Sequence, residues 1–220
     1  KGMTANLAWK VCGMKESQNI RDVLELAPDY LGFIFYPESP RYVLPGLEAG
    51  SVIPFSPSTK KVGVFVDADL ETISRNVARF SLDGVQLHGD ESPILVEQIK
   101  KLGVQVIKTF RLKRDKFDFA LLKDYRSYSD YFLFDTQGKA PGGNGEIFDW
   151  SILKNYPFDT PFFLSGGISV EALDRLPMLS GLPLHGIDVN SRFEYAPALK
   201  NIEALKVLKK TLKSFTTKIR

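Results

Sequence analysis

The chain of 220 residues carries 29 lysines and arginines against 26 aspartates and glutamates, and its net charge is +3. It has no dense basic stripe interleaved with aromatic residues, so we expect no nucleic-acid partner. No apolar run approaches the roughly 18 residues that a membrane helix needs, so we expect neither a membrane span nor a signal peptide, and the single cysteine fits a reducing cytoplasm.

The first strand-like run, residues 7–13, ends in that cysteine. Side chains alternate between the two faces of a strand, so Lys10 and Cys12 point the same way. A cationic neighbour favours the thiolate, which is the form of cysteine that takes protons. The alternative is that Cys12 is a small buried apolar residue, the commonest fate of a free cysteine.

Short apolar runs then alternate with runs of helical periodicity. The further strands are expected at 30–36, 61–66, 84–87, 105–110, 131–135, 162–164 and 186–189. The helices are expected at 17–26, 70–80, 92–102, 117–125, 169–176 and 201–215, with at most a short helix near 46–53. Ser17 to Asn19 offer caps for the first helix, Asp67 and Asp69 cap the next, and Gly103 ends the third.

Strands that are apolar on both faces are typical of a parallel sheet covered by helices. Eight strand–helix units in 220 residues predict an α/β fold, a single closed (β/α)8 TIM barrel that forms one domain. We give no meaning to residues 1–6, which could be an added or disordered start. A doubly wound open sheet is the competing arrangement, but residues 13–15 lack the glycine fingerprint that it normally has after its first strand.

In such a barrel the functional residues lie at the carboxyl ends of the strands. The strand assignment places the following residues there: Cys12, Arg41, Asp67, His88, Arg111, Asp135, the turn Ser165-Gly166-Gly167, and residues 188–191.

Glycines indicate where the chain could bind a phosphorylated small molecule. Gly166 and Gly167 let backbone amides approach a ligand, and a helix starting near Ser169 favours an anion. Asn190 and Ser191 add donors beside them, so we expect a phosphate there; a simple tight turn is the alternative. Glycines 143 and 145 form a second backbone cradle that could close over a ligand, or belong to a floppy surface loop.

Three side chains at the strand ends have chemistry to offer. Asp135 follows two phenylalanines and has no basic residue before Lys139, and burial there would raise its pKa and keep it protonated as an acid. Arg41, in a turn with prolines, could clamp a carboxylate in bidentate fashion, or be an ordinary loop arginine. His88 could bind a ligand or act as a base, although a hydrogen-bonding role is commoner. With His88 and His185 as the only histidines, we expect no metal site.

Eight segments in chain order resemble the phosphoribosylanthranilate isomerase family of tryptophan biosynthesis. They are 10–14 (KVCGM), 32–37 (GFIFYP) with 39–42 (SPRY), 63–66 (GVFV), 86–91 (QLHGDE), 134–136 (FDT), 142–145 (GGNG) with 148–150 (FDW), 164–167 (LSGG) and 186–191 (GIDVNS).

The resemblance implies a cofactor-free Amadori rearrangement that converts N-(5-phosphoribosyl)anthranilate, an aminoaldose, into an aminoketose. By position, Cys12 would be the general base and Asp135 the general acid, and Arg41 would hold the anthranilate carboxylate. The resemblance also assigns substrate contacts to His88, Gly143, Gly145 and Asp188, and phosphate contacts to Gly166, Gly167, Asn190 and Ser191.

Three residues depart from the pattern of the family: Asn144, Arg192 and Ala198. They lie in binding loops, so they put the affinity for the substrate in doubt more than the catalysed reaction. Two other functions stay open: the related histidine-pathway or a dual-substrate isomerase, whose base is an aspartate where this chain has Cys12, and a barrel that binds a phosphorylated ligand without turnover. The sequence leaves monomer and homodimer equally open.

Overall fold

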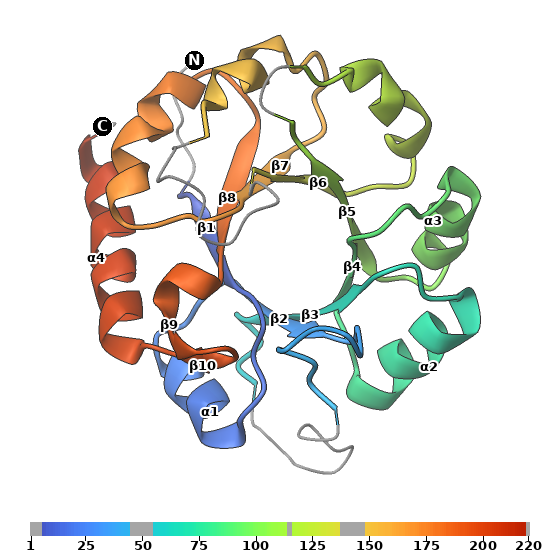
Figure 1. The fold of residues 1–220 in the computed structure, drawn as a ribbon, viewed down its shortest axis with the longest axis horizontal. Coiled ribbons are helices and arrows are strands. Elements are labelled where there is room, and N and C mark those ends of the chain that lie inside the picture. Colours follow the sequence, from blue (N-terminus) through green and yellow to red (C-terminus); the bar gives the residue numbers. More distant parts are fainter. Residues whose placement is uncertain (1–5, 45–54, 114–115, 137–147, 219–220) are drawn as a thin grey trace.

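The strands form a closed ring, as predicted. The structure is a computed structural model that describes residues 6–44, 55–113, 116–136 and 148–218. Strands β1 to β8 follow one another around a closed parallel barrel, with helices on its outside (Figure 1). The ring closes where β1 pairs with β8, with Lys10 opposite Asp188 and Val11 opposite Val189. The open doubly wound sheet is therefore excluded.

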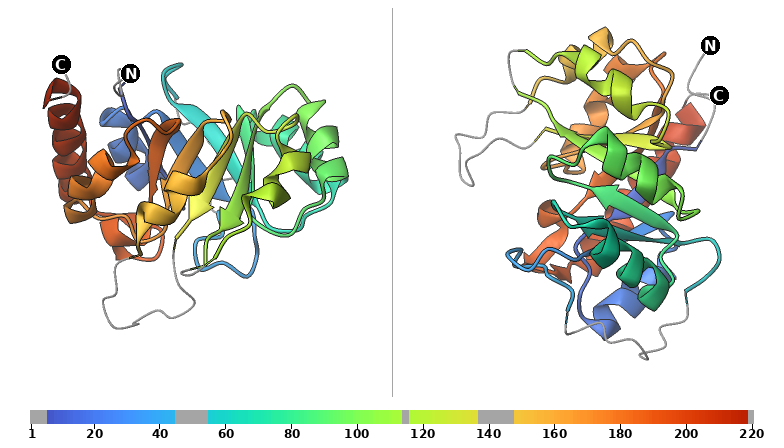
Figure 2. Two further views of the ribbon diagram at one scale, coloured as in Figure 1. Left: turned by 90° about the horizontal axis from the view of Figure 1, so that it is seen from above. Right: turned by 90° about the vertical axis from the view of Figure 1, so that its right-hand side faces the viewer.

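The expected strands are all present in the described residues. The barrel strands are β1 Ala8–Val11, β2 Tyr30–Ile34, β3 Lys60–Phe65, β4 Gly84–Leu87, β5 Gln105–Arg111, β6 Tyr131–Asp135, β7 Phe162–Ser165 and β8 Leu184–Val189. Because they are parallel, their carboxyl ends lie at one end of the barrel, which we call the mouth (Figure 2).

Four helices are α-helical and four are short 3-10 helices in the described chain. The α-helices are α1 Ser17–Glu25, α2 Leu70–Phe80, α3 Pro93–Lys100 and α4 Ile202–Lys218. The 3-10 helices are η1 Phe119–Tyr125, η2 Trp150–Asn155, η3 Glu171–Leu179 and η4 Ser191–Phe193.

The helices expected at 117–125 and 169–176 are present as the 3-10 helices η1 and η3, each beginning two residues later than expected. Pro177 lies inside η3, where its missing N–H interrupts the hydrogen-bond ladder of an α-helix. In η1 the side chain of Asp118 accepts from the amide of Ala120 only two residues on, which favours a tight turn. The expected helix near 46–53 lies outside the described residues.

The predicted helix caps are partly wrong. The side chain of Glu16, not of residues 17–19, caps α1 by accepting from the amides of Gln18 and Asn19. Asp69 caps α2 as predicted, through the amide of Thr72. Asp67 instead accepts from the amide of Asp90 in the loop after β4.

A small antiparallel hairpin, not predicted, lies between β8 and α4. Its strands are β9 Glu194–Ala196 and β10 Leu199–Lys200. Asn19 of α1 ties the hairpin to the barrel, because its side chain donates to the carbonyl of Lys200 at 3.0 Å and accepts from the Lys200 amide at 2.8 Å. The hairpin therefore lies beside α1, and follows directly from the mouth end of β8.

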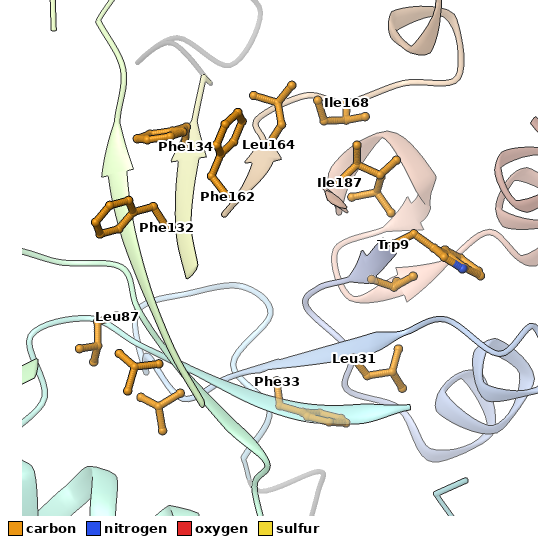
Figure 3. Packing of buried hydrophobic residues seen from close by; sticks show 14 of the residues in the cluster. Trp9, Leu31, Phe33, Leu87, Phe132, Phe134, Phe162, Leu164, Ile168 and Ile187 are labelled. Atoms are coloured by element: carbon orange, nitrogen blue, oxygen red, sulfur yellow. The ribbon is translucent and has the colours of Figure 1, made fainter. Parts of the chain in front are cut away.

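The alternation along each strand produces two separate cores. One face packs outward against the helices, and Figure 3 shows members of this cluster, among them Trp9, Phe132 and Ile187. The other face fills the interior of the barrel with a smaller cluster: Ala8, Tyr30, Val62, Ile107, Leu133 and Phe163. Polar side chains continue this inner face toward the mouth, which is where the candidate site lies.

Candidate active site

Cys12 lies at the mouth, one residue beyond β1. Its amide donates to the carbonyl of Val189 at 3.0 Å, which holds this residue against β8. Only 5% of the residue is exposed. Lys10 points to the same face as predicted, because Lys10 Nζ and Cys12 Sγ both lie beside the Cα of Gly32 on the neighbouring strand.

The pKa of Cys12 is nevertheless raised. Burial raises it most, and Asp188 raises it further, whereas Lys10 and Lys200 lower it. Lys10 thus acts in the direction expected from the sequence, but the loss of hydration outweighs it because the thiolate is the charged form. The effect expected of the cation is therefore present, but it is smaller than the effect of burial.

Lys10 and Asp188 form a buried ion pair beneath Cys12. Lys10 Nζ lies 3.0 Å from Asp188 Oδ1, and their side chains are 0% and 6% exposed. Asp188 Oδ2 accepts from Ser165 Oγ at 3.2 Å. Ser165 is in turn the register partner of Asp135 on β6. Polar side chains on neighbouring strands therefore line the inner face from Cys12 to Asp135.

Gly32 makes this arrangement possible, and sequence reasoning missed its role. A Cβ atom on Gly32 would lie 2.7 Å from Cys12 Sγ and 3.1 Å from Lys10 Nζ. Real Cβ atoms do not approach another atom as closely as 2.7 Å, so any larger residue would push the thiol aside and crowd the ammonium group. A glycine inside an otherwise apolar strand was the available signal, because such a glycine often marks a close approach.

Asp135 ends β6 and has a basic neighbour that its local sequence does not contain. His88 Nε2, beyond the end of β4, lies 3.5 Å from Asp135 Oδ2. Because β5 separates these two strands, the contact is made inside the mouth. The surroundings of Asp135 therefore include a basic side chain from another strand end.

Gln86, on β4, orients the ring of His88, which follows that strand. Its side-chain nitrogen lies 3.1 Å from His88 Nδ1, and the glutamine is 1% exposed. When the amide donates to Nδ1, the hydrogen of the ring is on Nε2 and faces Asp135. Gln86 Oε1 is buried and has no hydrogen-bond partner among the described residues.

A buried pair shapes the loop that carries His88. Glu91 accepts from the amides of Asp67 and Gly89, and Lys108 Nζ lies 3.2 Å from its Oε1. Lys108 also donates to the carbonyl of Gly89 at 2.9 Å. These contacts fix the backbone next to His88, so its ring is carried by a rigid loop.

Arg41 does clamp a carboxylate, but that carboxylate belongs to the protein. Its Nε donates to both oxygens of Glu194 at 3.1 and 3.0 Å, and its Nη2 lies 2.6 Å from Oε1. Glu194 comes from the unpredicted hairpin. The sequence offered no signal for this pairing, because the two residues are 153 positions apart.

The loops after β7 and β8 lie side by side, since these strands are paired. Gly166 and Gly167 have φ angles of 99° and 63°, which residues with side chains rarely adopt. The helix behind them, η3, is a 3-10 helix that begins at Glu171, two residues after the start expected near Ser169. Asn190 precedes η4, and Ser191, its first residue, is exposed.

Two predicted glycines, Gly143 and Gly145, lie outside the described residues. Within the described chain, no group of three or more acidic, histidine or cysteine side chains is placed to bind a metal ion. No helix in the same residues is long and apolar enough to cross a membrane.

The closed parallel barrel, with titratable and polar side chains gathered at the carboxyl ends of its strands, defines the class of (β/α)8-barrel enzymes. The family model described as N-(5'-phosphoribosyl)anthranilate (PRA) isomerase matches residues 9–211. The chain belongs to this isomerase family.

Individual relatives agree with the family model. A protein of Parabacteroides distasonis named N-(5'-phosphoribosyl)anthranilate isomerase is 45% identical over 199 residues, covering 90% of this chain and 89% of the relative. The crystal structure of phosphoribosyl anthranilate isomerase from Thermotoga maritima has a TM-score of 0.80 at 30% identity, covering 94% of this chain and 99% of that one.

A further solved structure of this kind contains a ligand. It is a phosphoribosyl anthranilate isomerase in complex with reduced 1-(o-carboxyphenylamino)-1-deoxyribulose 5-phosphate, with a TM-score of 0.77 at 28% identity. It covers 94% of this chain and 99% of its own.

Proposed function

We propose that this protein converts N-(5-phosphoribosyl)anthranilate into 1-(2-carboxyphenylamino)-1-deoxyribulose 5-phosphate, with Cys12 as general base and Asp135 as general acid. The observation that carries the proposal is the row of polar side chains, Lys10, Asp188 and Ser165, that lies between Cys12 and Asp135 inside one barrel mouth. The family to which the chain belongs supports the same reaction.

The proton transfers follow from the two roles. Asp135 gives its proton to the ring oxygen of the sugar, the bond from that oxygen to C1 breaks, and the anthranilate nitrogen forms a protonated imine with C1. Cys12, as thiolate, removes the proton from C2, and the C–H electron pair forms the double bond of an enolamine. The enolamine then gains a proton at C1 and loses one from the C2 hydroxyl, which gives the ketone. Each group is expected to supply about 10²–10⁴ in rate.

The same proposal assigns the binding contacts. Arg41 holds the anthranilate carboxylate, and the backbone of Gly166 and Gly167 with Asn190 and Ser191 holds the phosphate. The left-handed glycine pair supports this, since neither residue carries a side chain and the space beside the Cα of Gly167 is open to 4 Å. Asp188 already has protein donors on both carboxylate oxygens, which favours an indirect role beneath the substrate.

The remaining substrate contacts, His88, Gly143 and Gly145, are proposed on the resemblance, and His88 has the additional support of its contact with Asp135. The base must be a free thiol, so we place the reaction in the reducing cytoplasm. No cofactor takes part in any of these steps.

The test is the loss of substrate fluorescence on addition of the purified protein. We expect turnover with the wild type, with the ketose phosphate as the product identified by mass and absorbance. The matched control is the Cys12→Ala variant prepared in the same way, which reports any contaminating isomerase. Absence of turnover by the folded wild-type protein would contradict the proposed reaction.

A further inference from the structure

Glu194 is the centre of a buried charge network at the edge of the mouth. Besides Arg41, it accepts from Lys200 Nζ at 2.5 Å and from the amide of Ala198 at 2.9 Å. The side chains of Glu194 and Lys200 are 4% and 0% exposed, whereas 19% of the Arg41 side chain is exposed. Burial raises the pKa of Glu194, but the hydrogen bonds from Arg41 and Lys200 outweigh burial and lower it.

The network also reaches the loop after β8. Lys200 Nζ donates to Asn190 Oδ1 at 2.7 Å. A Cβ on Gly13 would lie 2.7 Å from Arg41 Cδ and 2.9 Å from Asn190 Oδ1, so the arginine stem and the asparagine pack closely over this glycine. The hairpin thus connects the side chains that follow β2 with those that follow β8.

The bonds to Glu194 use one particular edge of the guanidinium group. Arg41 donates through Nε and Nη2. A guanidinium has five N–H donors in a planar fork, and its other edge is formed by Nη1 and Nη2. No described residue accepts a hydrogen bond from Nη1. A second carboxylate can therefore bind to the end edge in bidentate fashion while Glu194 holds the side edge.

From this geometry we infer that Glu194 is a positioning residue, which fixes the plane of the Arg41 guanidinium so that its end edge points to the carboxylate of the substrate. The inference rests on the proposed function, since that assigns the substrate carboxylate to Arg41. Lys200 supports the role by balancing the charge of Glu194, so the cation of Arg41 is not cancelled within the network.

A different role for Glu194 would be that of a competitor. Its carboxylate would then occupy the place of the substrate carboxylate and leave when substrate arrives. The other donors argue against this role, because Lys200 and the Ala198 amide would each lose a buried partner if Glu194 swung away. The two roles predict opposite effects when the charge of Glu194 is removed.

The experiment compares Glu194→Gln with wild type on two ligands. One is reduced 1-(o-carboxyphenylamino)-1-deoxyribulose 5-phosphate, and the other is the same molecule without its ring carboxylate. We expect Glu194→Gln to weaken binding of the carboxylated ligand about tenfold, as for the loss of one charge-assisted interaction, and to leave binding of the other ligand within about twofold. KM for the substrate should rise as its binding weakens, while kcat changes by less than about threefold.

Three outcomes would overturn the inference. Unchanged or tighter binding of the carboxylated ligand would make Glu194 a bystander or a competitor, and an equal loss for both ligands would make its role purely structural. The matched control is Glu203→Gln, which removes an exposed carboxylate on α4 and should bind both ligands like wild type. If Glu194→Gln does not fold, Glu194→Asp keeps the charge, withdraws the oxygens and carries the same expectation.

A fourth variant separates this inference from the proposed function. Arg41→Ala should lose the preference for the carboxylated ligand altogether. If Arg41→Ala keeps that preference, the assignment of Arg41 fails; if only Glu194→Gln keeps it, the assignment stands and the positioning role of Glu194 fails.

Discussion

The pKa of the Cys12 thiol is set by opposing effects of its immediate neighbours. Burial raises its pKa, and Lys10 pulls the pKa back without reversing the shift. Asp188 weakens the effect of Lys10, because it pairs with the same ammonium group. The free enzyme therefore holds Cys12 mainly as the thiol near neutral pH, and a rise in pH increases the fraction that can act as base.

This environment predicts how the reactivity of the Cys12 thiol depends on pH. Since only the thiolate is a strong nucleophile, the rate at which iodoacetamide alkylates this single cysteine should increase with pH from about pH 6 to about pH 9, by up to about tenfold per unit. Lys10→Met removes the cation and should move the rise to still higher pH. The alkylation rates of both proteins measured across this range check the prediction, and a plateau already reached at about pH 6.5 would contradict a raised pKa.

Gly32 predicts a second effect of a single residue. Gly32→Ala puts a methyl group 2.7 Å from Cys12 Sγ, so the thiol must move and kcat should fall by about 10-fold or more, at a cost of about 1–3 kcal/mol in stability. Gly84→Ala is the matched control in β4, because its methyl group would meet no atom closer than 3.4 Å. Equal kcat values for the two variants would disprove the role of Gly32.

At the level of elements, hydrophobic periodicity located the strands and the helices after β5 and β7, but it did not predict that these two helices are of the 3-10 type. The strands are short apolar runs whose two faces are both buried, and this pattern is visible locally. The type of helix depends on features such as Pro177 and the tight turn at Asp118, which periodicity does not register. The hairpin β9–β10 was missed because it is short and has exposed residues such as Tyr195.

The attachment of the hairpin to α1 makes a testable contribution to stability. Asn19→Ala leaves the amide and the carbonyl of Lys200 without partners, which should lower the free energy of unfolding by about 1–3 kcal/mol. Gln18→Ala is the control, because its hydrogen bond to Asp22 is exposed and should contribute little. Urea denaturation measures both, and an Asn19→Ala value within error of Gln18→Ala would contradict the attachment.

For the molecule as a whole, the two ends of the barrel interior differ in the kind of side chain that fills them. The mouth carries the polar set described above, and the opposite end of the interior is filled by aromatic rings around His185. Tyr30 Oη lies 3.0 Å from His185 Nε2, and the ring of Tyr131 lies 4.3 Å from that of His185. Burial lowers the pKa of His185, so this end stabilises the neutral ring.

The lowered pKa of His185 predicts how stability depends on pH. The unfolded chain takes up the proton first as pH falls, so the stabilisation is complete above the ordinary value of 6.5 and is lost as pH falls through the folded-state pKa. Wild type should therefore lose more thermal stability than His185→Gln between about pH 7.5 and about pH 5.5. Equal losses of thermal stability in the two proteins would show that protonation of His185 does not cause the pH dependence.

The closed barrel and most residues at its mouth could be predicted from the sequence, because strand ends fix which residues meet there. What could not be predicted is the pairing of those residues with distant partners. Arg41 with Glu194, His88 with Asp135 and Lys10 with Asp188 are joined only when the ring closes. The net pKa of Cys12 also depends on burial, which no local pattern measures.

The central claim is that Cys12 and Asp135 act as base and acid on one bound substrate. The most direct test measures kcat for Cys12→Ala and Asp135→Asn together with their affinity for reduced 1-(o-carboxyphenylamino)-1-deoxyribulose 5-phosphate. We predict that kcat falls by about 10²–10⁴ in each variant, while the affinity stays within about threefold of wild type. A variant of either residue that turns over at the wild-type rate would contradict the claim.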